Sequence, residues 1–475
     1  MKTICKEIQR SAGQWSALFL TIAIAFGISN TAFASIVHLP PGTANSGPIP
    51  IGTGAGEAPL DEWSFVPFSD TSCGDPGTTA GISFYPSSTV DKNHLLIYFL
   101  GGGFCYTYNT CYNMRLGEAA PGFGNDVQRL HGFTVNNPPQ IQPVLHNDNA
   151  ADGNPFADWS KVLVWYCTGD NHTGNHVATY RDPNGHSHQI NHVGYTNMQK
   201  YLSRLKATFC ASSTCTMPAP THIAVVGSSA GGWGAVWNFE QVRDTFGIAA
   251  SNIQLIDDVG PYLRTPYWTP TLQSKMALSW WGAGTGTIPT ACAVAGYNCD
   301  PRSGGQLNAL LGDLHTRFPQ LRASLIEGMA DGVISSALSR QTYGPPDNHP
   351  PFAPHPCGSA SAGDCGPYGY PGLIVYPSYR LHGYFCDQAL PDYTANQPAG
   401  FTTFEITASQ VWSGRTYDPS YHPWLNTIPL NVVHAVDGTL LSDFLSDQVS
   451  GTGTAWANHI YTASNASTTC SGWSF

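Results

Sequence analysis

Residues 223–232 read IAVVGSSAGG and decide the fold. The first four are aliphatic, as in a strand that is buried on both faces of a parallel sheet, and small residues suited to a helix follow. Gly227 and Gly231 stand two residues before and two residues after Ser229, where they allow a sharp backbone turn. The stretch predicts a nucleophile elbow, a turn that lifts the Ser229 hydroxyl above the sheet. The alternatives are an ordinary strand-to-helix turn, or Ser228 as the nucleophile, which lacks the flanking glycines.

Other segments complete the predicted sheet. Further buried strands are expected over residues 95–100, 162–166, 253–256 and 323–326. Apolar residues at helical spacing predict helices over 196–209 and 307–314. Strands that alternate with helices form a mostly parallel sheet with helices on both faces, and ligands lie beyond the carboxyl ends of its strands. We therefore predict an α/β fold of the α/β-hydrolase type, with disulfide-stapled loop insertions.

The chain divides into three parts. Residues 1–34 combine a basic start, an apolar run of about 14 residues and a final Ala-Phe-Ala, which predicts a signal peptide cleaved near Ala34. An uncleaved anchor is the alternative, but a membrane span needs about 20 apolar residues. Residues 35–60 are expected to form an extended lead-in, and residues 61–475 a single catalytic domain. Within that domain, residues 342–400 are dense in Pro, Gly, Tyr and Cys and are expected to form an insertion, a candidate cap over the site.

Composition agrees with export and disfavours several partners. The chain has 13 cysteines, and an even number remains once the signal segment is removed, as expected in an oxidising compartment. The pairs close enough in sequence to form local disulfides are Cys105/Cys111, Cys210/Cys215, Cys292/Cys299 and Cys357/Cys365. The formal charge is −11, and the signal segment carries +2, so the remainder carries −13, which disfavours nucleic acid. We expect a secreted or periplasmic monomer with no membrane span in the mature chain.

Gly101, Gly102 and Gly103 follow an earlier predicted strand. Because they have no side chains, their N–H groups can approach a developing alkoxide, and one such donor contributes about a hundredfold or more in rate. Taken alone, the segment would be a plain glycine turn. With an elbow downstream, we assign the oxyanion hole to the N–H groups of Gly102, Gly103 and Ala230.

Three blocks of sequence together resemble the pectinacetylesterase family, a group of pectin acetylesterase- and Notum-like α/β-hydrolases. The blocks are GGGFC at 101–105 followed by Cys111, YCTGDNH at 166–172, and GSSAGG at 227–232. The resemblance covers about residues 90–445 and suggests an exported member of the bacterial type. It implies a Ser-Asp-His triad and no metal. Two features depart from the family: the insertion at 342–400 is long, and Asp258-Val259-Gly260 stands where Asp-Ser-Gly is usual.

The triad acid must follow Ser229 in the chain and precede the histidine. Asp331 comes after the expected strand 323–326 and resembles the triad aspartate of the family. Asp257 and Asp258 are the alternatives, but they end the strand directly after the elbow. Carboxylates there are more often structural or pocket-lining.

Two histidines compete for the role of base. His422 precedes the expected final helix at the spacing of the family's catalytic histidine. His434 lies closer to that helix within Val-Val-His, and its apolar neighbours favour a packed histidine with a satisfied hydrogen bond. We prefer His422.

Further residues are expected to contact substrate, and none to bind metal. The candidate substrate-binding residues are Phe104, Asp170, His172, Trp233 and Asp258. The histidines at 172, 176, 186, 188 and 192 are dense enough to suggest a metal site, but their spacing matches no standard zinc pattern. The neighbouring Asn, Gly and Asp favour a polar loop. We expect no metal and no cofactor.

These residues predict a serine carboxylic-ester hydrolase that removes acetyl or other short acyl groups from a polysaccharide or polyol. The first alternative keeps the triad and changes the substrate to longer acyl esters or polyesters, for which the aromatic-rich composition leaves room. The second is a non-catalytic binding protein on the same fold, which would have no use for Ser229, Asp331 and His422 together. The negative charge fits a neutral ester better than pectate.

Overall fold

The computed structural model describes residues 36–89, 93–113, 143–145, 153–283, 296–328, 331, 333–334, 390–398, 400–406, 410–412, 415–417, 422, 424–425 and 428–460. Residues 36–475 group into one unit and residues 1–35 into another. The predicted signal peptide, most of the predicted insertion and the question of a cap therefore lie outside the described residues. Within the described part of the chain, no helix is both long and apolar enough to cross a membrane.

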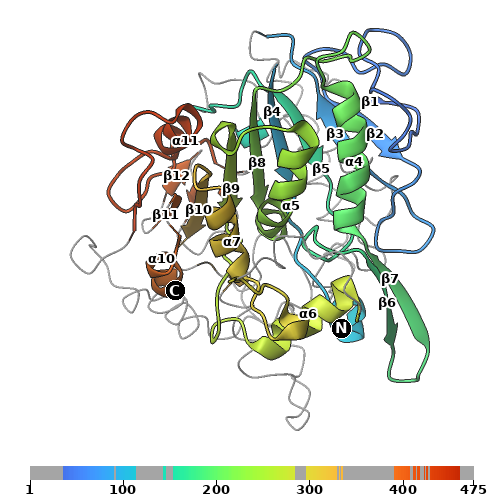
Figure 1. Cartoon of the computed structure of the whole chain (residues 1–475), viewed down its shortest axis with the longest axis vertical. Coiled ribbons are helices and arrows are strands. Elements are labelled where there is room, and N and C mark those ends of the chain that lie inside the picture. The colour runs from blue at the N-terminus through green and yellow to red at the C-terminus, as the bar shows by residue number, and fades with distance from the viewer. Residues whose placement is uncertain are drawn as a thin grey trace, which may run out of the picture. The chain divides into compact units, whose positions relative to one another are not determined.

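A nine-stranded sheet forms the centre of the unit (Figure 1), in the order β1-β2-β3-β5-β4-β8-β9-β10-β11. Its strands are β1 (Val37–His38), β2 (Ser64–Phe68), β3 (Ala80–Tyr85), β4 (His94–Phe99), β5 (Ser160–Val164), β8 (His222–Ser228), β9 (Ile253–Asp258), β10 (Arg322–Gly328) and β11 (Phe401–Ile406). Only the two pairings made by β3 are antiparallel. Every strand predicted from an apolar run is present, which confirms the mostly parallel sheet.

Helices α4 and α5 pack on the sheet (Figure 1), and their buried faces follow from the sequence. The helices are α4 (Gly194–Thr208), α5 (Ala230–Phe246), α6 (Pro270–Trp281), α7 (Ala309–Arg317), α10 (Leu390–Ala395) and α11 (Leu441–Ser450). Met198, Tyr201 and Leu205 of α4 are buried, as the helical spacing predicted. Helix α11 is attached to the sheet by Gln448, whose amide donates to the carbonyl oxygens of Leu255 and Arg322.

Two parts of the structure differ from the sequence-based expectation. Residues 176–192, expected to be a polar loop, form the hairpin of β6 (His176–Arg181) and β7 (Ser187–His192), which projects from the body (Figure 1). The lead-in contributes the edge strand β1, and Ile36, Leu39 and Ile49 are buried in the core. A second small hairpin joins β12 (Gln410–Trp412) to β13 (Arg415–Tyr417).

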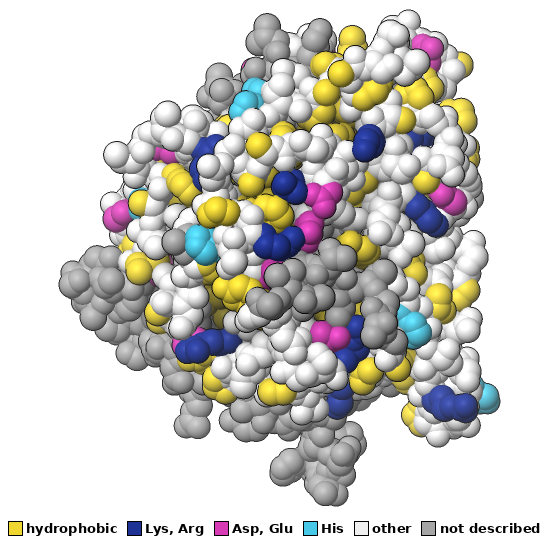
Figure 2. Space-filling view, viewed as in Figure 1, with side chains coloured by type: hydrophobic (Ala, Val, Ile, Leu, Met, Phe, Trp, Pro, Cys, Tyr) yellow, Lys and Arg dark blue, Asp and Glu magenta, His cyan; other side chains and the backbone are white. Residues whose placement is uncertain are grey.

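The surface agrees with the low content of charged residues. On the described part of the face in Figure 2, basic and acidic side chains lie singly or in small mixed groups among uncharged ones. Ion pairs among the described residues include Arg317 with Glu240 and Arg264 with Asp392. This face therefore offers no large field of one sign to attract a charged polymer.

Disulfides connect the loops that follow the strands. Cys105–Cys111 and Cys210–Cys215 confirm two of the predicted local pairs. Cys299 is also disulfide-bonded, whereas Cys292, Cys357 and Cys365 lie outside the described residues. The third described bond, Cys73–Cys167, closes 94 residues and was not predicted. It anchors the end of β5, and the loop that follows supports the glycine segment, because the carbonyl oxygen of Gly169 accepts from the Cys105 N–H at 2.9 Å.

We expect the long-range disulfide to contribute more stability than a local one. In the chain-entropy account, closing a loop of this length stabilises by about 4 to 5 kcal/mol, against about 2 kcal/mol for the five-residue separation of Cys210–Cys215. The double variant Cys73→Ser/Cys167→Ser should therefore lower the melting temperature clearly more than the matched Cys210→Ser/Cys215→Ser. Thermal unfolding followed by circular dichroism measures both. Equal losses would contradict this account.

Candidate functional site

Ser229 stands at the turn between β8 and α5, in the geometry predicted for a nucleophile elbow. Its backbone has φ 58° and ψ −125°, a conformation that a non-glycine residue adopts only when its surroundings impose it. The Ser229 N–H donates to the carbonyl oxygen of Asp258 at 2.7 Å, and its own carbonyl oxygen accepts from Gly232 at 2.9 Å. The strained turn is thus held on both sides.

The glycines around the elbow are required by close packing. A Cβ on Gly227 would lie 2.0 Å from the carbonyl oxygen of Gly231, and one on Gly231 would lie 2.0 Å from that of Phe99. Any side chain at either position would push α5 away from the strands. These contacts explain the spacing seen in the sequence.

The predicted oxyanion segment lies directly beside Ser229. A Cβ on Gly101 would come within 2.8 Å of the Ser229 Cβ and 2.4 Å of the Ser228 carbonyl oxygen. Gly103 has φ +71°, which favours glycine. Ala230 is the first residue of α5, where helix N–H groups have no intrahelical partner and the helix dipole favours negative charge. The glycine segment and the N-terminus of α5 therefore both adjoin Ser229.

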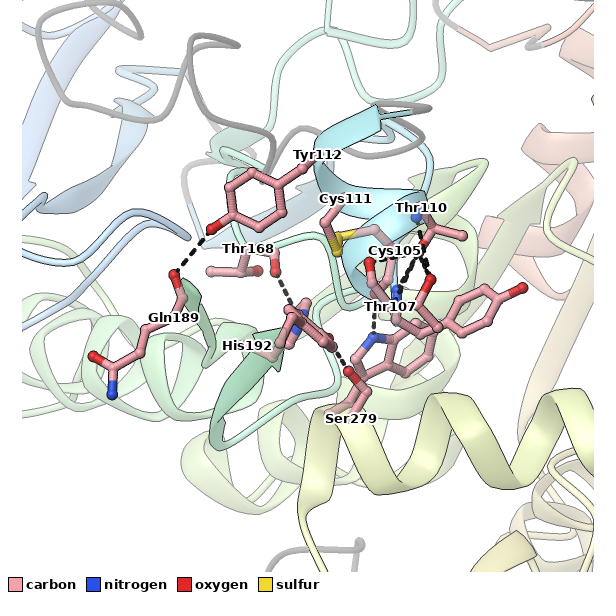
Figure 3. The surroundings of a disulfide bond; sticks show 12 residues. Cys105, Thr107, Thr110, Cys111, Tyr112, Thr168, Gln189, His192 and Ser279 are labelled. Atoms are coloured by element: carbon pink, nitrogen blue, oxygen red, sulfur yellow. Dashed lines mark hydrogen bonds between the residues drawn. A yellow bond between two sulfur atoms is a disulfide. The ribbon is translucent and has the colours of Figure 1, made fainter. Parts of the chain in front are cut away.

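A disulfide fixes the loop that continues from these glycines (Figure 3). Cys105 and Cys111 are fully buried, and the Thr107 and Thr110 side chains bond to the loop between them. The indole N–H of Trp280 donates to the Cys105 carbonyl oxygen at 2.9 Å. The segment is thereby tied both to itself and to α6.

Asp331 and His422, far apart in the sequence, form a close pair. The His422 Nδ1–H donates to Asp331 Oδ2 at 2.5 Å, and both side chains are almost completely buried. Asp331 Oδ1 accepts the N–H groups of Val333 and Ile334 at 2.8 Å each. The other ring nitrogen of His422, Nε2, is buried and accepts no hydrogen bond from the described residues. An imidazole held this way keeps its Nε2 lone pair free to take a proton.

Asp258 joins the elbow to the segment that carries the histidine. Its Oδ2 accepts the Ser228 hydroxyl at 2.5 Å and the Leu425 N–H at 3.0 Å, and the Trp424 N–H lies 3.2 Å from both oxygens. The Tyr98 hydroxyl lies 2.6 Å from the Ser228 Oγ and completes the chain of bonds. One carboxylate thus holds the neighbour of Ser229 and the residues just after His422.

The charge of Asp258 is maintained by these donors. Burial raises its pKa to about 6, while the bonds from Ser228, Leu425 and Trp424 and the proximity of His422 oppose the rise. The carboxylate is therefore ionised at neutral pH. Because it is fully buried and its oxygens are occupied by protein donors, its geometry is that of a clamp inside the protein.

The corner after Asp258 is also tightly built. Val259, where the family usually has serine, is fully buried at φ 60°, and its N–H donates to the Ile326 carbonyl oxygen at 2.9 Å. A Cβ on Gly260 would lie 2.5 Å from Asp257 Oδ1 and 2.8 Å from the Ser229 carbonyl oxygen. Val259 therefore contributes only apolar packing and a backbone hydrogen bond at this corner, because its side chain has no hydroxyl group.

Asp170 and His172 are buried and bonded within the protein. Asp170 accepts N–H groups of Gly194 (2.7 Å), His172 (3.0 Å) and Gly174 (3.1 Å), and the Thr168 hydroxyl at 2.6 Å. His172 Nε2 lies 2.8 Å from the Leu100 carbonyl oxygen, and burial lowers the pKa of the ring to about 4, so the neutral ring donates this bond. The two residues support the start of the oxyanion segment from beneath.

Phe104 and Trp233 belong to a cluster of aromatic rings next to the elbow. Trp233 stacks on Tyr262, with centroids 4.7 Å apart, and Phe104 stacks on Trp233 at 6.5 Å. Trp268 and Trp280 close the cluster around Phe104. Trp233 is buried and Phe104 is half-buried, so the rings fill much of the space beside the first turn of α5.

The remaining histidines do not gather around a metal position. His186 and His188 bond to Asp182, and His176 faces His192 across the β6–β7 hairpin. Within the described residues, the only group of three suitable ligands is Cys105, Cys111 and His192, and both sulfurs are in a disulfide rather than free thiolates.

His434 is exposed rather than packed, which corrects the expectation drawn from its apolar neighbours. Its backbone N–H and ring Nδ1 both lie 3.3 Å from Gln410 Oε1. The residue therefore bonds to the β12 strand, while His422 is the histidine that the fold brings to Asp331.

We expect Asp258→Asn to lower kcat/KM for a simple ester by about 10- to 100-fold. The asparagine amide would place donors against the Trp424 and Leu425 N–H groups, and an unsatisfied buried donor costs about 1 to 3 kcal/mol. Ser228→Ala leaves both backbone bonds to Asp258 in place and should have a smaller effect. Steady-state kinetics of both variants measures the two effects, and melting temperatures show that each variant is folded. Wild-type kinetics in Asp258→Asn would refute the clamp.

Comparison with known proteins adds the family context. Residues 67–278 match the family model described as Pectinacetylesterase, a stretch that contains Gly101–Gly103 and Ser229 but neither Asp331 nor His422. The chain is 25% identical over 237 residues to the palmitoleoyl-protein carboxylesterase NOTUM of Drosophila melanogaster, a match that covers 48% of this chain and 32% of the relative. The chain thus spans about a third of that curated relative.

Two solved structures of the Wnt deacylase Notum from Drosophila also match. The first covers 82% of this chain and 92% of its own, with a TM-score of 0.48 and 16% identity. The second covers 75% and 90%, with a TM-score of 0.42 and 15% identity. The family match to residues 67–278, which includes the elbow and the glycine segment, supports a relationship with the pectinacetylesterases.

Proposed function

We propose that this protein is an exported serine carboxylic-ester hydrolase of the pectinacetylesterase family, with Ser229 as nucleophile, His422 as base and Asp331 as the acid that orients it. One observation carries the proposal. The buried His422 bonds to Asp331 through Nδ1 and leaves Nε2 without a partner among the described residues, in a segment that Asp258 ties to the elbow. The family match and the carboxylesterase relative support the same class of reaction.

The reaction is acyl transfer in two halves. His422 Nε2 takes the proton of the Ser229 hydroxyl, and the Ser229 Oγ attacks the ester carbonyl carbon. The tetrahedral intermediate collapses as His422 returns the proton to the leaving alcohol, which leaves an acyl group on Ser229. Water, deprotonated by His422, then attacks this acyl-enzyme, and the carboxylic acid leaves as Ser229 recovers its proton. Asp331 holds the imidazole in the reactive tautomer and stabilises its charged form.

The oxyanion of both intermediates would be held by backbone N–H groups of Gly102, Gly103 and Ala230. The close approach of Gly101 to Ser229 supports this assignment, because it places the glycine segment beside the nucleophile. Such donors are fixed before reaction, so they stabilise the developing charge without reorganisation. Asp170 and His172 act in this proposal as supports for the segment rather than as contacts to substrate.

The proposed substrate is a short acyl ester, such as an acetyl ester, of a neutral polysaccharide or polyol. The proposal rests on the aromatic cluster beside α5, where Trp233 is buried against other rings and Phe104 is the half-exposed member that a small acyl group could contact. The net charge of −11 disfavours a strongly acidic polymer. The second candidate is a longer acyl ester, which the name of the palmitoleoyl-protein carboxylesterase favours.

The test uses p-nitrophenyl esters from acetate to palmitate with purified mature protein. Ser229→Ala and His422→Ala should each lower kcat by about a thousandfold or more, because the triad acts as a unit. His434→Ala is the matched control and should keep activity within about twofold, since that histidine is exposed and bonds elsewhere.

The outcomes separate the candidate functions. A rate that falls steadily beyond short chains supports the short-acyl proposal, and a maximum at long chains supports the second candidate. Loss of activity in His434→Ala with activity retained in His422→Ala would reverse the assignment of the base. Hydrolysis that survives in Ser229→Ala would overturn the serine mechanism, and inactivity of the wild type on all esters would favour a binding protein.

A further inference from the structure

A group of buried carboxyl groups lies beneath the proposed triad, and one of them has no role in the mechanism above. Glu327 stands near the end of β10, four residues before Asp331, and its side chain is fully buried. The turn between them is closed by the Asp331 N–H, which donates to the Gly328 carbonyl oxygen at 3.0 Å. This turn places the two carboxyl groups near each other, and both are fully buried, so they interact in a region without solvent.

The two oxygens of Glu327 differ in their partners. Oε1 accepts the Gly328 N–H at 3.0 Å, whereas Oε2 is buried and finds no donor among the described residues. Its neighbour Asp331 offers only carboxylate oxygens, and two carboxylates cannot bond without a proton between them. A buried polar atom left without a partner destabilises the folded protein, so a proton in this contact is strongly favoured.

The donors around the pair decide which residue keeps the proton. Asp331 accepts three strong bonds, from the Val333 N–H, the Ile334 N–H and His422. Among the described residues, Glu327 accepts a single bond, from the Gly328 N–H. Hydrogen bonds to the charged form favour ionisation, so Asp331 is the anion and Glu327 the neutral acid.

The acidic groups around Glu327 also favour its neutral form. Asp257 and Asp258 approach from β9, and Glu405 of β11 lies opposite Glu327 in the sheet register. Tyr393 adds a weakly acidic group from α10. Burial raises the pKa of Glu327 well above its ordinary range, and the negative charges of Asp331, Asp257 and Asp258 raise this pKa further.

We propose that Glu327 is a neutral carboxylic acid whose Oε2 hydroxyl donates a hydrogen bond to the Asp331 carboxylate and thereby positions the triad acid. Glu327 is a positioning residue, because it acts on the reaction through Asp331 and His422. The hydrogen bond from Glu327 holds Asp331 in place without adding a second charge. The pair therefore presents a single negative charge, that of Asp331, to His422. The inference rests on the proposed triad for its effect on catalysis, but the proton on Glu327 does not depend on that function.

Two substitutions of Glu327 separate the effect of its hydrogen bond from the effects of its charge and of its side-chain volume. Glu327→Gln keeps a neutral donor in place and should retain kcat within about threefold, with the acid limb of the kcat/KM profile unmoved. Glu327→Leu removes the donor and should lower kcat by about tenfold with little change in KM, and it should move the acid limb to higher pH, because Asp331 then presents a less compensated charge to His422. Glu405→Gln makes the same chemical change on the adjacent strand and should leave the profile in place.

The opposite charge state makes a different prediction. If Glu327 were ionised, Glu327→Gln would remove a negative charge near His422 and move the acid limb down by about one pH unit. That shift, or equal losses of kcat in Glu327→Gln and Glu327→Leu, would overturn the proposal. Melting temperatures show whether each variant is folded.

An infrared measurement tests the proton directly, without any substrate. The spectrum of wild type minus Glu327→Gln at neutral pH should contain the carbonyl band of a protonated carboxyl group. A carboxylate band in its place would contradict the proposal even if the esterase were active. If the carboxyl band is present while Ser229→Ala remains active, the proposed function fails and the assignment of the proton stands.

Discussion

The site depends on one buried carboxylate, that of Asp258. Its oxygens accept hydrogen bonds from the Ser228 hydroxyl, beside the proposed nucleophile, and from the backbone just after His422, although these segments are almost 200 residues apart in the chain. Its own backbone carbonyl accepts the Ser229 N–H, so the same residue also holds the strained turn. Without this link, the elbow and the histidine segment would be positioned independently, and a displacement of about an ångström between nucleophile and base can cost a hundredfold in rate.

The acidic groups around Asp258 differ in their ionisation state. Asp258 stays ionised at neutral pH because its donors limit the rise in pKa that burial causes, and Asp331 faces an imidazole and two N–H groups. Burial and the nearby charge of Asp258 raise the pKa of Asp257 well above the ordinary range, and the Gly260 N–H opposes this rise only in part. Buried carboxyl groups so close together cannot all be charged, and the number of donors at each one determines which of them is. The proton proposed on Glu327 follows from the same rule.

The sequence contained the local features of this site but not its long-range contacts. The elbow could be predicted because glycine spacing and an aliphatic strand act within ten residues, and the sheet could be predicted because its strands are continuous apolar runs. Positions and spacings that resemble those of a family pointed to Asp331 and His422, and in the structure His422 Nδ1 lies 2.5 Å from Asp331 Oδ2.

The features that were missed depend on partners distant in the chain. Asp258 was expected to contact substrate, but its bonds to Trp424 and Leu425 exist only once the sheet is assembled. The same holds for Cys73–Cys167, whose residues are 94 apart. The proposed contact of Glu327 with Asp331 is local, but no spacing rule reveals it. The hairpin at 176–192 was read as a loop because its polar residues hide the alternation of a strand.

The central claim is that His422 activates Ser229, and covalent labelling tests it most directly. A fluorophosphonate probe reacts with a serine only when a base withdraws its proton. Peptide mass spectrometry should find the label on Ser229 in the wild-type protein and should find little or none in His422→Ala. Labelling of Ser228 instead, or labelling of Ser229 that is equally fast without His422, would contradict the account.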